Sequence, residues 1–163
     1  AQGWTIGPDG DNYRRLVASP LPKRILQIEI IEMLVKQGVT IICAGGGGIP
    51  VAPLAGGGHT GVEAVIDKDR TSALLATQLS ADALLILTDV EGVFLDWGLP
   101  NQTLINVMQA TNIRIRDYPL GSMAPKLEAA ASFVNAGGKL SGIGKLDAAL
   151  AILEGRAGTI IKN

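Results

Sequence analysis

Three charged residues carry the chemistry that this sequence could perform. Lys68 and Asp69 belong to a charged turn, residues 67–69, that directly follows an apolar pair, and Lys126 lies at the predicted start of another helix. A lysine at a helix N-terminus faces the positive end of the macrodipole, and an anion docked at the same end offsets this cost. Two lysines with a carboxylate between them supply the positioning and charge neutralisation that phosphoryl transfer requires. The pattern therefore predicts a site for a phosphate-bearing ligand.

The segment 61–94 contains the elements that must position the first of these groups. Its charged turn, residues 67–69, is followed by a predicted helix from about Arg70 to Ser80 and by a short apolar run, Ala83–Leu87. The run is typical of a buried parallel strand. Ligands of parallel sheets bind beyond the carboxyl ends of the strands. We therefore expect the charged turn and the loop that starts at Thr88 to face one crevice.

Four glycines, Gly45–Gly48, form a second candidate ligand-binding feature. They follow the apolar run Val39–Ala44, a predicted strand, and their bare backbone lets a ligand approach its N–H groups. A flexible surface loop is the alternative. The dinucleotide-binding fingerprint needs a helix at this point, and Pro50 and Pro53 exclude one, so a dinucleotide oxidoreductase is rejected.

The helix that carries Lys126 has its own start signals. Ser122 is a plausible cap, and Pro125 is tolerated in a first helical turn. Apolar residues keep helical spacing up to Val134, and Gly137-Gly138 ends the run. The Walker pattern is absent, so the predicted phosphate site is not of the P-loop type.

The composition of the 163 residues favours an aliphatic core, with 47% hydrophobic residues and 4% aromatic ones. Such a core suits an α/β domain, with parallel strands covered by helices on both faces. The length suits a single domain, residues 1–163, with residues 1–22 as an irregular lead-in. Further predicted elements are helices at 23–37 and 146–153, strands at 140–143 and 159–162, an extended piece at 14–18 and a helical turn at 106–110.

The charge pattern excludes several classes of partner. The net charge is −1 and no long basic run is present, which argues against a nucleic-acid surface. No apolar run reaches the ~18 residues of a membrane-spanning helix. The single cysteine, Cys43, is interpreted as a small buried hydrophobe, and without a disulfide framework the cytosol is the default compartment.

Three other features have two interpretations each. Arg14-Arg15 is either a pair of surface arginines or an anion contact. His59 has no second histidine or cysteine at ligand spacing, so a solvated loop residue is favoured over a metal ligand, and no metal site is predicted. Trp97 is interpreted as a packing anchor rather than a platform for a ligand.

The motifs, taken in order, resemble those of carbamate kinases. They are GGGGIPV, EAVIDKD, ADALLILTDVEGVF, WGLP, GSMAPKLEAAASFV and a terminal GTII, and RRLVASPLP also resembles a mid-chain segment of that family. The resemblance covers nearly the whole chain. It implies the amino-acid kinase fold, a three-layer α/β/α sandwich around a mainly parallel sheet. It also implies reversible phosphoryl transfer between ATP and carbamate, with Mg²⁺, in a cytoplasmic homodimer.

The sequence departs from the family at its beginning. Carbamate kinases open with a strand and a glycine-rich loop, roughly A-L-G-G-N-A, which holds carbamate and the transferring phosphate, and nothing similar is found here. Ala1 corresponds to a point near the middle of such a protein. The resemblance therefore implies the nucleotide-binding C-terminal half of the fold, inactive by itself and expected either as a homo-oligomer or paired with the N-terminal half. In the last motif, Ala124 replaces a common glycine.

The resemblance also implies roles for individual residues. Lys68 matches a phosphate-contacting lysine, Asp69 an aspartate that orients the catalytic lysines, and Lys126 a lysine that neutralises charge on the transferring phosphoryl group. The implied ATP- and ADP-binding positions are Gly45, Gly46, Gly47, Gly48, Thr88, Asp89, Val90, Val93, Phe94, Gly121, Ser122 and Met123.

A stand-alone nucleotide-binding or regulatory module without catalysis is the competing hypothesis. In that case Asp69 would serve as a helix cap, because a carboxylate is stabilised at a helix start. The presence of Lys68, Asp69 and Lys126 together favours the kinase, and the unmatched opening half favours the module.

Overall fold

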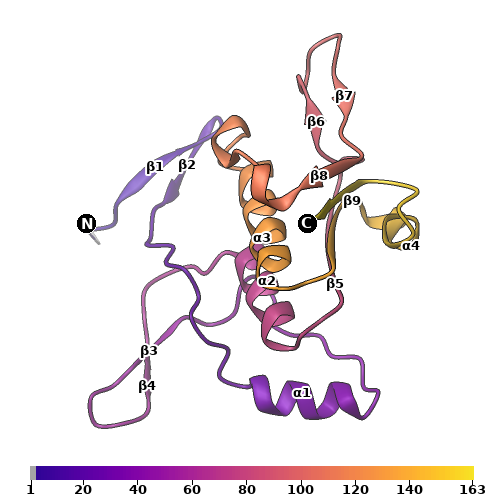
Figure 1. The fold of residues 1–163 in the computed structure, drawn as a ribbon. Helices are drawn as coiled ribbons and strands as arrows, with labels where there is room; N and C mark the ends of the chain where they lie inside the picture. Colours follow the sequence, from indigo (N-terminus) through magenta and orange to yellow (C-terminus); the bar gives the residue numbers. More distant parts are fainter. Residues whose placement is uncertain (1–2) are drawn as a thin grey trace.

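The computed structural model describes residues 3–163, and a four-stranded sheet forms its centre (Figure 1). The strand order is β5 (Ala83–Thr88), β9 (Leu140–Lys145), β10 (Thr159–Lys162) and β8 (Val107–Gln109). Strands β5 and β9 are parallel, as are β10 and β8, while β10 runs antiparallel to β9. The sheet is therefore mixed but mainly parallel.

Helices cover both faces of this sheet. Helices α2 (Lys68–Gln78) and α3 (Met123–Asn135) share one face, where their buried residues form a single apolar cluster with β5, β9 and β10. The short helix α4 (Ala149–Leu153), entered through the 3₁₀ turn η3 (Leu146–Ala148), lies on the other face. Its Ile152 is fully buried against strand β9. The predicted α/β fold with three layers is confirmed.

Three glycines surround the side chain of Ile152. A Cβ atom at Gly142, Gly144 or Gly158 would lie 2.4, 2.8 and 3.0 Å, respectively, from an Ile152 side-chain atom. Because real Cβ atoms hardly ever approach this closely, the absence of side chains at these positions is what lets α4 rest directly on the sheet.

The core between α2, α3 and the sheet is aliphatic, as the composition predicts. Leu127, Phe133 and Ile143 are fully buried there, and alanines line both helices. The side chain of Asp67 caps α2 by accepting a hydrogen bond from the Arg70 N–H at 2.9 Å. The predicted start near Arg70 was therefore two residues late.

Three hairpins and two 3₁₀ turns surround this centre. The hairpins are β1 (Ile6–Asp9) with β2 (Asn12–Arg15), β3 (Val51–Pro53) with β4 (His59–Gly61), and β6 (Phe94–Leu95) with β7 (Thr103–Leu104); the turns are η1 (Ala110–Asn112) and η2 (Ile115–Asp117). The prediction that residues 1–22 are irregular is wrong for 6–15. The predicted helical turn at 106–110 is wrong as well, because β8 occupies most of it.

Helix α1 (Ile28–Lys36) stands apart from the helices that cover the sheet (Figure 1). The predicted helix began at residue 23, so it was five residues too long at its start. The predicted strand Val39–Ala44 is also wrong, because no other described segment pairs with it. Its Ile42 is 99% exposed, and Ile30 and Met33 of α1 are more than half exposed. Residues 28–44 therefore present a large apolar surface, called the α1 surface below.

Thr159 ties three segments together inside the structure. Its side chain is fully buried; Oγ1 accepts a hydrogen bond from the Val93 N–H at 2.8 Å and donates one to the Ile105 carbonyl at 2.6 Å. The hydroxyl, at the start of β10, therefore pairs with a backbone N–H group and a backbone carbonyl that come from two other segments.

Replacing Thr159 by valine removes the hydroxyl and leaves both backbone groups without this partner. Leaving a buried polar group unpaired costs about 1–3 kcal/mol, so we expect Thr159→Val to lower the unfolding free energy by about 2 kcal/mol or more. Thermal unfolding followed by circular dichroism measures this. The control Thr159→Ser keeps the hydroxyl and loses one methyl group, worth about 1 kcal/mol. A valine variant that melts at or above the serine variant would contradict this account.

Candidate functional site

The connections between helices and strands bring two helix N-termini to one edge of the sheet. Short turns lead from the C-terminus of α2 into β5 and from the C-terminus of α3 into β9. Since β5 and β9 are parallel, both helices run back against them, and their N-termini lie at the carboxyl edge of the two strands (Figure 1). Unpaired N–H groups and two macrodipoles make this edge electropositive.

Asp69 links the two lysines that lie at this edge. Its Oδ2 is 3.1 Å from the Lys126 Nζ of α3 and 3.4 Å from the Lys68 Nζ. The Asp69 and Lys126 side chains are only 9% and 13% exposed, whereas the Lys68 side chain is 59% exposed. One buried carboxylate therefore holds one ammonium inside the protein and a second one at its surface.

The structure corrects one interpretation of Asp69. The helix cap is Asp67, and Asp69 lies inside the first turn of α2 with its carboxylate directed to the lysines. A second ion pair, Arg70 to Glu128 at 2.8 Å, joins the same two helices one turn further along. The contacts of Asp69 are thus between helices and not those of a cap.

The glycine loop is locked against the start of α2. Thr71, which is buried, donates a hydrogen bond from Oγ1 to the Gly47 carbonyl at 2.9 Å. Gly47 has φ +128°, and a Cβ atom there would lie 1.9 Å from the Ile66 carbonyl oxygen. Any side chain at this position is excluded, so the loop needs glycine at 47. Gly45, Gly46 and Gly48 are exposed.

The predicted nucleotide positions after β5 have different environments. Thr88 ends the strand, and its hydroxyl donates to the exposed Asp89 carboxylate at 3.0 Å; Val90 lies in the turn that follows. Val93, in contrast, is fully buried, and both its N–H and its carbonyl are used internally. It belongs to the core and is not placed to contact a ligand. Phe94 is half-buried, with its ring centroid 5.1 Å from that of Trp97.

The predicted positions at the start of α3 lie at the same edge as Lys126. Gly121 and Ser122 are exposed and Met123 is half-buried. Ser122 occupies the position before the helix, but its hydroxyl makes no capping hydrogen bond, so the predicted cap is wrong. Nearby, burial and the Asp117 carboxylate raise the pKa of the Tyr118 phenol above its usual range.

The residues with open interpretations lie elsewhere. Arg15 forms an ion pair with Glu63 and stacks 4.5 Å from the Trp4 ring centroid. His59 is exposed, as predicted, but in strand β4 rather than in a loop. Cys43 is half-buried rather than buried, and Trp97 is more than half exposed, so it is a weak packing anchor.

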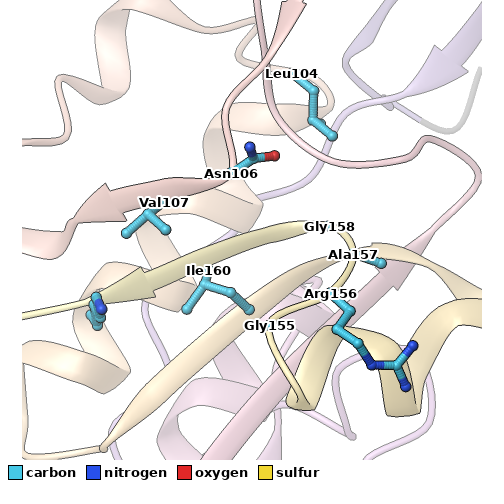
Figure 2. Close-up of a pocket in the computed structure, with 9 residues that line it drawn as sticks. Leu104, Asn106, Val107, Gly155, Arg156, Ala157, Gly158 and Ile160 are labelled. Carbon is cyan, nitrogen blue, oxygen red and sulfur yellow. The ribbon is translucent and has the colours of Figure 1, made fainter.

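A cavity of about 420 Å³ opens between β8, β10 and the turn 155–158 (Figure 2). Val107 and Ile160, which are partners on the neighbouring strands β8 and β10, line it together with Arg156 at one side. None of the predicted site residues lines it. Within residues 3–163, no group of three histidine, cysteine or acidic side chains is arranged to hold a metal ion. The helices of that same range are all too short or too polar to cross a bilayer.

Comparison with known proteins decides the family. A sequence model described as the amino acid kinase family matches residues 8–143. The chain belongs to this family. It is similar to the carbamate kinase of Haemophilus influenzae, with 49% identity over 160 residues that cover 98% of this chain and 52% of that protein. The carbamate kinase of Rhizobium meliloti is 46% identical over 164 residues, covering 99% and 51%.

Solved structures show the same relationship. The carbamate kinase from Giardia lamblia bound to AMP-PNP matches with a TM-score of 0.88 and 36% identity, covering 98% of this chain and 52% of that one. The resemblance that the motifs predicted is confirmed. The chain spans about half the length of the curated relatives it matches.

Sequence reasoning missed several supporting residues. Asp67 could have been identified, because aspartate is a preferred N-cap residue and stands just before the helix. Thr71 had no local signal, because its partner Gly47 is 24 residues away. The Arg70–Glu128 pair had no local signal, because its partners are 58 residues apart. Lys145, the last residue of β9, was not singled out, because the predicted strand ended at residue 143.

The tight packing of Gly47 against Ile66 can be tested by comparing two glycine substitutions in the same loop. Gly47→Ala would place a Cβ against the Ile66 carbonyl, and with the strained φ we expect a loss of about 2 kcal/mol or more in unfolding free energy. A chain of this size then melts about 4–8 °C lower, measured by calorimetry. Gly46→Ala is the control, since open space surrounds that position and its φ is not positive. Equal melting temperatures for the two variants would show that position 47 does not require glycine.

Proposed function

We propose that this chain is the ATP- and ADP-binding half of a carbamate kinase-like phosphotransferase, which interconverts ATP plus carbamate with ADP plus carbamoyl phosphate. The main support for this proposal is that Asp69 contacts both Lys68 and Lys126 at the N-termini of two helices. This arrangement suits phosphoryl transfer, in which the protein mainly positions the reactants and neutralises charge.

Each of the three residues has a distinct part in this proposal. Lys126, largely buried, contacts the transferring phosphoryl group and offsets the charge that develops on its oxygens. Lys68, which reaches solvent, contacts the phosphate chain from the other side. Asp69 touches no substrate; it is a positioning residue that holds both ammonium groups in place.

The nucleotide lies along the carboxyl edge of β5 and β9. Its contacts come from the glycine loop 45–48, from residues 88–90 and Phe94, and from residues 121–123 at the start of α3. Mg²⁺ takes oxygen ligands and is commonly carried by nucleotide phosphates and water rather than by a protein cage. The exposed Asp89 carboxylate is the oxygen donor that fits such an ion at this edge. The ion would neutralise charge on the phosphates.

The carbamate part of the site comes from a second polypeptide portion, equivalent to the half of the relatives that this chain does not match. The α1 surface suits it, because more than half of each of the Ile30, Met33 and Ile42 side chains is exposed there. In this proposal residues 1–163 form one nucleotide-binding domain, which acts in the cytoplasm as part of a homodimer or paired with that second half.

A nucleotide-binding module without catalysis is the second candidate, favoured by the limited span of the match. The two are distinguished by what Lys126 does. A module needs no largely buried ammonium next to the phosphates, whereas a kinase does. Loss of Lys126 should therefore affect turnover far more than nucleotide affinity.

The chain itself tests the first part of the proposal. We expect ADP to bind weakly, with heat detectable by calorimetry at about 1 mM nucleotide. We also expect no ATP formation from ADP and carbamoyl phosphate by residues 1–163 alone, because the carbamate-holding loop is not among them. A folded sample that gives no heat would contradict nucleotide binding. ATP formation that disappears in Lys126→Ala would contradict the inactivity of the isolated half.

Asp69→Asn separates positioning from folding. The measurement uses a chimaera in which this chain replaces the matching half of the Haemophilus influenzae relative. Asparagine cannot hold two ammonium groups by charge, so we expect turnover to fall by about 10²-fold or more. The control Asp67→Asn keeps a good cap and should retain both turnover and melting temperature. Wild-type turnover in Asp69→Asn would show that its charge has no part in catalysis.

A further inference from the structure

A third lysine lies at the edge of the sheet that carries Lys68 and Lys126. Lys145 is the last residue of β9, and in the parallel register of β5 and β9 it stands directly beside Thr88. Both residues end their strands at the carboxyl edge, where α2 and α3 begin. Lys145 therefore borders the loop 88–90 that the proposed function assigns to the nucleotide.

The alternation of β9 shows which face Lys145 occupies. Ile143 is buried in the cluster shared with α2 and α3, whereas Gly142 and Gly144 face Ile152 of α4. Side chains two residues apart in a strand point to the same face, so Lys145 leaves the sheet on the side of α2 and α3.

The same reasoning places Thr88 on that face. Leu84 and Ile86 of β5 belong to the cluster with α2 and α3, and Thr88 follows them in the alternation. Thr88 and Lys145 are thus neighbours on two adjacent strands, on the face and at the edge where Lys126 also lies.

The charged side chains at this edge are lysines and aspartates. Three lysines and two helix N-termini are positive, and the carboxylates of Asp67, Asp69 and Asp89 are negative. Lys145 is exposed and, within residues 3–163, makes no hydrogen bond or ion pair; the adjacent Asp89 carboxylate is bonded to Thr88 instead. An exposed ammonium group at a strand end, with no carboxylate bonded to it, suits an anionic ligand such as a phosphate.

We propose that Lys145 binds a phosphate of the nucleotide that is not transferred, next to Thr88. The proposal rests on the proposed function, since it names a further contact of the same site. Lys145 differs from Lys126 in exposure and is not held by Asp69. Because the phosphate that it contacts is not the one transferred, Lys145 is expected to act mainly on the nucleotide affinity and less on the rate of the chemical step.

The experiment compares ADP with adenosine in calorimetry on the 163-residue chain. Loss of a charged contact to phosphate should raise the Kd for ADP about tenfold in Lys145→Ala and leave the Kd for adenosine unchanged. Lys145→Arg should bind ADP within about twofold of wild type, because arginine also donates to phosphate. Melting curves verify that each variant is folded.

Lys162→Ala is the matched control. Lys162 is also an exposed lysine that ends a strand, but β10 runs antiparallel to β9, so it lies at the opposite edge of the sheet. We expect its ADP affinity to equal that of wild type. If Lys162→Ala weakens ADP binding as much as Lys145→Ala, the effect is one of net charge and the proposal fails.

The other outcomes separate this proposal from the proposed function. Wild-type chain that binds ADP, with Lys145→Ala binding it equally well, overturns the Lys145 contact alone. An equal loss for adenosine shows that Lys145 does not act on phosphate and also overturns it. Folded wild-type chain that binds no ADP overturns both proposals together.

Discussion

The buried carboxylate of Asp69 is the countercharge on which the candidate site depends. Two ammonium nitrogens bonded to one oxygen lie within about 6.5 Å of each other, where like charges repel by about 2–3 kcal/mol at an effective dielectric constant of 20. Both also stand near positive helix N-termini. Without a carboxylate between them, Lys126 could not remain largely buried. The site is therefore built around a negative group that need not contact any ligand.

This requirement determines how the surrounding elements must pack. Asp69 and Lys126 come from different helices, so α2 and α3 must be close together and fixed along their axes. Small buried residues such as Ala73, Ala76 and Ala130 allow the close approach. The Arg70–Glu128 ion pair adds a second link between the helices. The tightly held Gly47 then fixes the glycine loop to the same helix start.

The sequence predicted the central elements well because their signals are local. The final strand, Thr159–Lys162, has the predicted bounds, and both helix starts that carry Lys68 and Lys126 were located within two residues. Pairing is not local, and this explains the failures. Val39–Ala44 has the composition of a strand but no neighbour among residues 3–163. The first hairpin was overlooked although its two-residue loop, Gly10-Asp11, is a recognised turn signal.

The site illustrates the same division. Helix dipoles and residue types predicted a charged edge, but two aspartates stand two residues apart and either could cap the helix. Only the side-chain geometry assigns the cap to Asp67 and the bridge to Asp69. Val93 shows the opposite case, because Asp89 and Glu91 of the same motif are exposed while Val93 belongs to the core. A motif gives the position of a residue along the chain and not the direction of its side chain.

The packing of Ile152 among three glycines has a consequence for local unfolding of the molecule. A helix of five residues has almost no stability of its own, so α4 depends on the packing of the Ile152 side chain against these glycines. Its detachment leaves the ladder between β5 and β9 intact, which makes it a sub-global opening with a free energy below that of unfolding. The backbone amide hydrogens of α4 should therefore exchange with solvent before those of β9. Lys145, the last residue of β9, lies between the fast-exchanging and the slowly exchanging segment.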